Sequence, residues 1–90
     1  MYVPHLPGAE LVEQGLADLA SGTETIEALL VSMAEPALRN IGVDVPQTLD
    51  DADLRLYALL YAQHGDAAHG RYNSLRRRLV SFQRAARCAR

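Results

Sequence analysis

Apolar residues recur at helical spacing along most of this 90-residue sequence, and glycine, proline and capping residues divide the pattern into separate segments. Strand signals are almost absent. The pattern predicts an all-α fold: a small four-helix bundle-like domain with a short extra helical turn and a long basic C-terminal helix. We expect one helical domain over residues 1–90, because a chain of this length forms a single core.

The first predicted helix begins at Pro7 or Gly8 and ends at Ala20. Its apolar side chains fill one arc of the helix and its polar side chains fill the opposite arc, as in an ordinary amphipathic surface helix. The apolar arc comprises Leu11, Val12, Gly15, Leu16 and Leu19.

The second predicted helix starts at Ser21 and Glu24, which have the spacing of a capping box. It should end near Ala34, because Pro36 disfavours helical geometry in the residue before it. Its expected buried stripe comprises Ile26, Leu29, Leu30 and Met33.

The middle of the chain combines a short helical turn, a connector and a third long helix. Pro36 opens the turn, which Gly42 closes, and residues 43–47 form the connector. A cap formed by Thr48 and Asp51 predicts a helix that runs to about His64. Its apolar arc is wide enough to predict packing on two sides, and it contains Leu49, Leu54, Leu56, Tyr57, Leu59, Leu60 and Tyr61.

The last predicted helix begins at Asp66 as its N-cap and continues toward the end of the sequence. Apolar residues follow at alternating spacings of four and three, which is the seam of helix packing. The seam predicts a long helix laid across the others and held by apolar contacts rather than by charge. It comprises Ala68, Tyr72, Leu75, Leu79, Phe82, Ala86 and Ala89.

Charge is distributed unevenly along the sequence. Residues 67–90 carry seven arginines and no carboxylate, whereas residues 1–66 carry eleven carboxylates and two arginines, a formal charge of −9. Helix dipoles account for the carboxylates in first turns and for arginines in the last turn. They do not account for Arg71 or for Arg76, Arg77 and Arg78. We expect the two parts to neutralise each other within the chain or across a dimer.

The leading functional hypothesis is association with other proteins without enzymatic activity. It rests on the wide apolar arc of the third long helix and on a seam longer than a 90-residue core requires. A homodimer is the simplest form, because two-fold contacts are the commonest. The alternative partner is a different protein. The predicted association surface comprises Leu54, Tyr57, Tyr61, Tyr72, Leu75, Leu79 and Phe82.

The alternative hypothesis is binding of nucleic acid or another anion by the arginine-rich helix. Guanidinium groups suit phosphate and carboxylate, and the candidate residues are Arg71, Asn73, Arg76, Arg77 and Arg78. A basic helix after a glycine turn also fits the recognition helix of a helix-turn-helix. The sequence does not favour nucleic acid, because it is acidic as a whole and the aromatic residues of this helix lie on the seam rather than on the exposed side.

Other functions have little support in the sequence. His64, Asp66 and His69 are the only cluster of metal-binding or acid–base residues, and the histidines are five apart across a glycine, so we predict no metal, cofactor or catalytic residue. One cysteine, no secretory signal and no apolar run of about 20 residues favour a cytoplasmic protein without membrane contact. The use of arginine without lysine is typical of a GC-rich bacterial genome.

Overall fold

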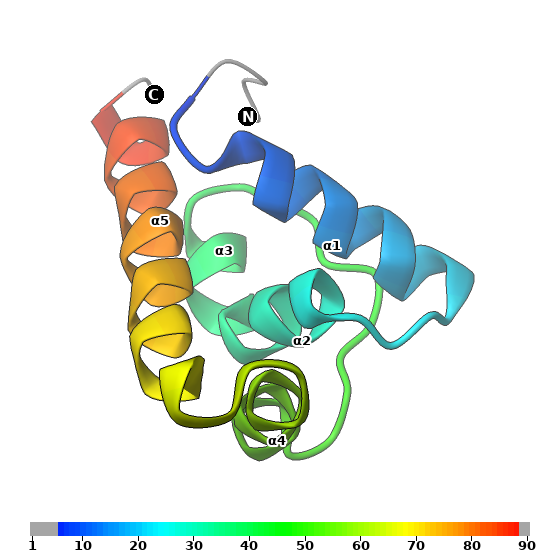
Figure 1. Cartoon of the computed structure of the whole chain (residues 1–90). Coiled ribbons are helices and arrows are strands. Elements are labelled where there is room, and N and C mark those ends of the chain that lie inside the picture. The colour runs from blue at the N-terminus through cyan, green and yellow to red at the C-terminus, as the bar shows by residue number, and fades with distance from the viewer. Residues whose placement is uncertain (1–5, 89–90) are drawn as a thin grey trace.

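The structure, a computed structural model, describes residues 6–88. Its helices are α1 (Ala9–Ser21), α2 (Ile26–Met33), α3 (Glu35–Asn40), α4 (Ala52–His64) and α5 (Ala68–Cys88), with a 3-10 turn at Gly65–Ala67. No residue between 6 and 88 lies in a β-strand, which confirms the predicted all-α fold. In Figure 1, α2 lies at the centre of the molecule, and it packs against both α1 and α4.

The helices α1 and α2 approach each other closely at Gly15. A Cβ atom at this position would lie 2.5 Å from the carbonyl oxygen of Glu27 and would also overlap the side chain of Val31. Glycine therefore lets the two backbones approach more closely than any other residue would. Because α2 lies between α1 and α4, it is buried on more than the predicted stripe: Ala28, Leu29, Leu30, Val31 and Ser32 are buried, and Ile26 and Met33 are half-buried.

The start of α2 differs from the predicted capping box, which was wrong. Ser21 is the last residue of α1, and its hydroxyl donates a hydrogen bond to the carbonyl oxygen of Asp18. Thr25 is the N-cap: its Oγ1 accepts from the Ala28 N–H at 3.1 Å and donates to Asp18 Oδ2 at 2.6 Å. Ser21, Thr23 and Thr25 are all able to cap a helix, and the hydrogen bond to Asp18 favours Thr25.

Proline and glycine mark the bounds of α3 as the sequence predicts. The second helix ends at Met33 with Ala34 as its C-cap, and Pro36 lies in the first turn of α3. Gly42 follows α3 with a φ of 90°, the left-handed conformation expected of a glycine after a helix.

The segment between α3 and α4 is held against the core by side chains of the two preceding helices. The buried Ser32 hydroxyl accepts from the Leu49 N–H at 2.6 Å, and Arg39 Nη2 donates to the Val45 carbonyl at 2.9 Å. Val43 and Val45 are themselves buried. This segment therefore fixes where α4 begins.

The predicted cap of α4 by Thr48 and Asp51 was also wrong. Asp51 precedes the helix in a left-handed conformation, with φ 52° and ψ 40°, and no side chain caps the first turn. The chain is held at Leu49 by Ser32 and turns at Asp51 instead. α4 packs on α2 and α5 and buries Leu56 and Leu60, whereas the rest of its wide apolar arc is only partly covered.

α5 follows directly from the 3-10 turn, so Asp66 lies inside that turn and is not the N-cap that the sequence suggested. The seam is oriented as predicted: Ala68, Leu79, Phe82 and Ala86 are buried, and Tyr72 and Leu75 are half-buried. Ala89 lies outside the described residues. A second close approach joins α5 to the start of α1, because a Cβ atom at Gly8 would lie 2.6 Å from the carbonyl oxygen of Arg78.

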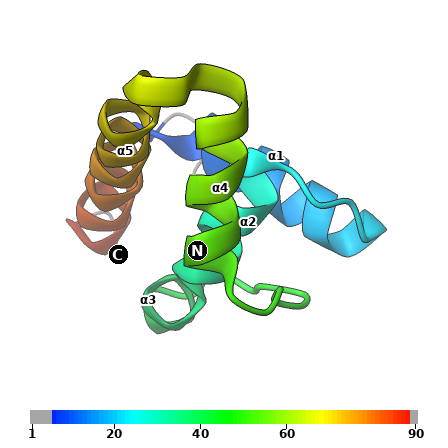
Figure 2. The same ribbon diagram turned by 60° about the horizontal axis from the view of Figure 1, so that its bottom comes forward.

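The arrangement leaves α4 and α5 on the outside of the molecule. Figure 1 shows α5 along one edge, with α4 seen end-on near the beginning of α5, and Figure 2 shows α4 along its length between α5 and α1. Within residues 6–88, no helix has both the length and the apolar character needed to cross a membrane.

Candidate interaction surfaces

The residues of the predicted association surface fall into two groups in the structure. Phe82 and Leu79 are buried within the chain, and Tyr72 and Leu75 are half-buried, so these four side chains hold α5 against the other helices. The three residues on α4 are exposed: Leu54 by 67%, Tyr61 by 58% and Tyr57 by 37%. Only the α4 part of the predicted surface is therefore open to a partner.

The exposed apolar residues of α4 form a continuous row, which we call the α4 stripe: Leu54, Tyr57, Ala58 and Tyr61. Residues three and four apart are neighbours on a helix surface, so these side chains adjoin one another. The stripe lies opposite the buried Leu56 and Leu60. The sequence indicated an arc of this width, but not which half of it would remain uncovered.

Tyr57 is fixed at the corner between α4 and α5 by aromatic contacts. Its ring lies edge-on to the ring of Tyr72, with centroids 5.6 Å apart, and 6.4 Å from the imidazole of His69. The Arg76 guanidinium lies 5.8 Å from the centroid of the Tyr72 ring, and the Tyr72 hydroxyl donates to the sulfur of Met33 at 3.6 Å. These contacts hold one side of the α4 stripe against α5.

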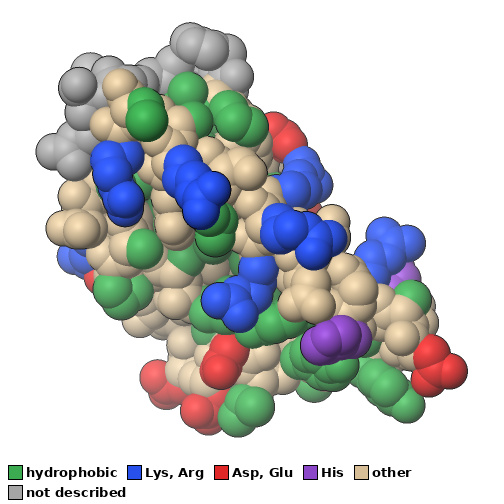
Figure 3. All heavy atoms as spheres, turned by 90° about the vertical axis from the view of Figure 1, so that its left-hand side faces the viewer, with side chains coloured by type: hydrophobic (Ala, Val, Ile, Leu, Met, Phe, Trp, Pro, Cys, Tyr) green, Lys and Arg blue, Asp and Glu red, His purple; other side chains and the backbone are tan. Residues whose placement is uncertain are grey.

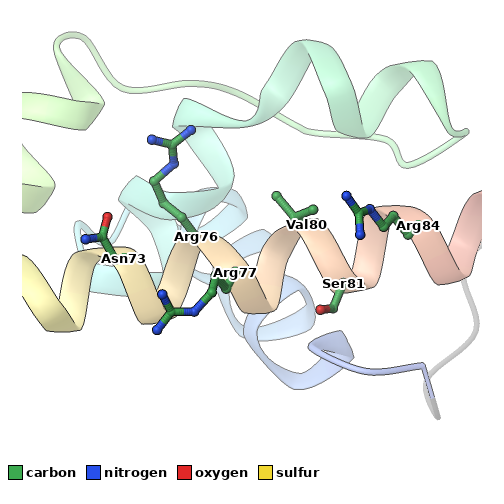
Figure 4. Close-up of a pocket in the computed structure, with 6 residues that line it drawn as sticks. All are labelled: Asn73, Arg76, Arg77, Val80, Ser81 and Arg84. Atoms are coloured by element: carbon green, nitrogen blue, oxygen red, sulfur yellow. The ribbon is translucent and has the colours of Figure 1, made fainter.

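A second surface runs along the outer side of α5, and we call it the arginine face. Its residues line a shallow depression of about 470 Å³ and comprise Asn73, Arg76, Arg77, Val80, Ser81 and Arg84. Figure 4 shows Arg76, Val80 and Arg84 projecting to one side of the helix and Arg77 and Ser81 to the other. In Figure 3, arginine side chains are spread over the face of the molecule that α5 presents.

The arginines proposed from the sequence do not form a single site. Asn73, Arg76 and Arg77 lie on the arginine face, whereas Arg71 and Arg78 line a depression on the side toward α1. Arg84 also lies on the arginine face, although it was not among the candidate anion-binding residues. Its spacing of seven from Arg77, two helical turns, was the signal that could have identified it.

Among residues 6–88, Arg78 is the one arginine of α5 that forms the expected pair with a carboxylate. Its guanidinium pairs with the carboxylate of Glu10 on α1, and both side chains are largely exposed. Within residues 6–88 the other ion pairs are Arg39 with Glu35 and Arg55 with Glu24. The arginines of the arginine face therefore have no carboxylate partner among the described residues, and the face remains positively charged.

The histidine cluster at the turn shows no metal-binding geometry. Among the described residues, no three His, Cys, Asp or Glu side chains are grouped as a metal ion requires. The His69 ring nitrogen Nε2 instead lies 3.2 Å from the side-chain amide nitrogen Nδ2 of Asn73. Cys88 is exposed at the end of α5. Comparison with protein-family models, curated proteins and solved structures finds no match to this chain.

Proposed function

We propose that this protein is a non-enzymatic, cytoplasmic association module that forms a homodimer through the α4 stripe. In this proposal a small four-helix bundle-like domain, with α3 as its short extra turn and α5 as its long basic C-terminal helix, presents α4 to a second copy. The observation that carries the proposal is the exposure of Leu54 and Tyr61 on one row of α4. Contiguous exposed apolar patches mark interaction sites.

The gain from covering the stripe supports a specific contact. Burying a leucine-sized side chain contributes about 1.5 to 3 kcal/mol. A two-fold contact buries each stripe residue in both copies of the protein, so each residue contributes twice. Aromatic residues are also enriched at the centre of protein interfaces. Tyr57 is already held by Tyr72 and His69, so less conformational entropy is lost when it is covered.

A second copy is favoured over an unrelated protein because the stripe is complementary to itself. If two α4 helices pack antiparallel about an axis between Tyr57 and Ala58, Tyr57 of each copy faces Ala58 of the other. The same register places Leu54 opposite Tyr61 of the second copy. A large side chain thus faces a small one at the centre, as close helix packing requires.

The test is the molar mass of the protein as a function of concentration. Light scattering or sedimentation from about 1 to about 200 µM should show a monomer–dimer equilibrium. Replacing both Leu54 and Tyr61 by serine should raise the dissociation constant at least about tenfold, a change of about 1.4 kcal/mol. Val80→Ser is the matched control, because Val80 is also exposed and apolar but lies on α5. A monomer at every concentration would refute the homodimer.

A further inference from the structure

We infer that the arginine face binds the backbone of duplex nucleic acid, with α5 lying in the major groove. This function goes beyond the proposed association and depends on different residues. Three exposed arginines, Arg76, Arg77 and Arg84, lie on this face, and α5 contains no carboxylate. An α-helix fits the width of the major groove.

The electrostatics of α5 favour a polyanionic partner. Arg76, Arg77 and Arg84 have no ion pair with a carboxylate of residues 6–88, whereas Arg78 is already paired with Glu10. Guanidinium groups that are not neutralised internally displace the counterions condensed on phosphates, and this release provides most of the affinity for a nucleic-acid backbone.

The spacing of the arginines favours a polymer over a small anion. Arg76 and Arg84, which project to the same side of α5, are eight residues apart. This separation corresponds to about 12 Å along the helix axis. A single phosphate or carboxylate ion is too small to bridge that distance, whereas successive phosphates of one strand supply charges along the whole face. The arginine face therefore matches a repeating anion.

The directions of the side chains favour a duplex. Arg76 and Arg84 project to one side of α5 and Arg77 projects to the other, so arginines point toward both walls of a groove that holds the helix (Figure 4). Asn73 lies before Arg76 along the helix, and Ser81 lies between Arg77 and Arg84 (Figure 4). Both residue types can donate to and accept from base edges. No described helix covers this side of α5 (Figures 1 and 3).

The two competing polyanions fit less well. Single strands are usually bound by stacking on exposed aromatic rings. On α5, however, Phe82 is buried and the half-buried Tyr72 already contacts Tyr57 and Arg76. Among residues 6–88, the exposed tyrosines lie on α4 and do not line the arginine face. An acidic protein would need an apolar centre on this face, and Val80 is its one large apolar side chain.

The experiment is fluorescence anisotropy of a labelled duplex of about 20 base pairs titrated with the full chain at salt concentrations from about 50 to 200 mM. Three phosphate contacts predict that log affinity falls with log salt at a slope of about −2.7, from about −0.9 per contact. Changing Arg76, Arg77 and Arg84 together to alanine should remove this slope and weaken binding at least about tenfold at the lowest salt.

Two control variants separate local contacts from net charge and from misfolding. Arg39→Ala with Arg55→Ala removes exposed arginines that pair with the protein's own carboxylates, and it should leave duplex affinity within about twofold. Changing the three face arginines to lysine keeps the charge and should retain the salt slope. Circular dichroism establishes that each variant is folded before its affinity is interpreted.

Three results would overturn the inference. The first is no binding of the duplex at the lowest salt, and the second is binding that the triple alanine variant leaves unchanged. The third is equal or tighter binding of a single strand of the same length, or of polyglutamate, which would assign the face to single-stranded nucleic acid or to an acidic protein.

Discussion

The α1–α2 pair and the α4–α5 pair differ in where they place their apolar side chains. In α1 and α2, glycine and aliphatic side chains lie inside the molecule, and the two backbones meet at Gly15. In α4 and α5, apolar and basic side chains also lie on the outer surface, as the α4 stripe and the arginine face. The residues of α1 and α2 thus stabilise the fold, whereas α4 and α5 also carry residues that remain exposed on the surface.

The largest expected effect comes from making the same substitution in both pairs. Leu30 of α2 is fully buried, so Leu30→Ala should lower the free energy of unfolding by about 2 to 5 kcal/mol. Leu54 of α4 is 67% exposed, and Leu54→Ala should change it by less than about 0.5 kcal/mol. Urea denaturation at a protein concentration of about 1 µM measures both. Equal losses would remove the distinction between the two pairs.

A smaller loss should follow from adding one methyl group between α1 and α2. Gly15→Ala places a Cβ atom against the Glu27 carbonyl and the Val31 side chain, so the helices must separate. We expect a loss of about 1 to 3 kcal/mol in thermal or urea unfolding. Gly70→Ala is the control, because a Cβ atom at Gly70 meets nothing within 4 Å. A variant at Gly15 as stable as the control would show that the close approach is not required.

The smallest expected effect sharpens the comparison at the junction of α1 and α2. Thr25→Ala removes the acceptor for the Ala28 N–H and the donor to Asp18, and should cost about 1 kcal/mol. Ser21→Ala removes only a hydroxyl at the exposed end of α1 and should cost less. Thermal melting curves of the two variants measure both losses of stability. A larger loss for Ser21→Ala than for Thr25→Ala would show that Ser21, not Thr25, caps α2.

Sequence periodicity predicted where the helices lie better than it predicted the residue at which each helix begins. Pro36 and Gly42 act through local backbone geometry, so the end of α2 and the turn after α3 followed from the sequence. The caps did not, because Thr25 is selected by a hydrogen bond to Asp18 of the preceding helix. Likewise α4 starts three residues after Leu49, whose N–H donates to Ser32, a residue distant in the sequence.

The candidate surfaces were predictable in composition but not in extent. The wide arc of α4 contains both Leu56 and Leu54, and only the position of α2 determines that the first is covered and the second exposed. On α5, the candidate anion-binding residues included both Arg77 and Arg78, which lie on different sides of the helix in the structure. The pairing of Arg78 with Glu10 depends on how α1 packs.

The contact between Gly8 and Arg78 has a consequence for the order of events during synthesis. It joins the beginning of α1 to the middle of α5, two segments at opposite ends of the described chain. A growing chain can pair α1 with α2 as soon as Met33 has emerged, whereas Gly8 has no partner until Arg78 has been made. Closing so long a loop costs more entropy and slows folding. Docking of the arginine-bearing helix is therefore a late step, taken on a nucleus that α1 and α2 already provide.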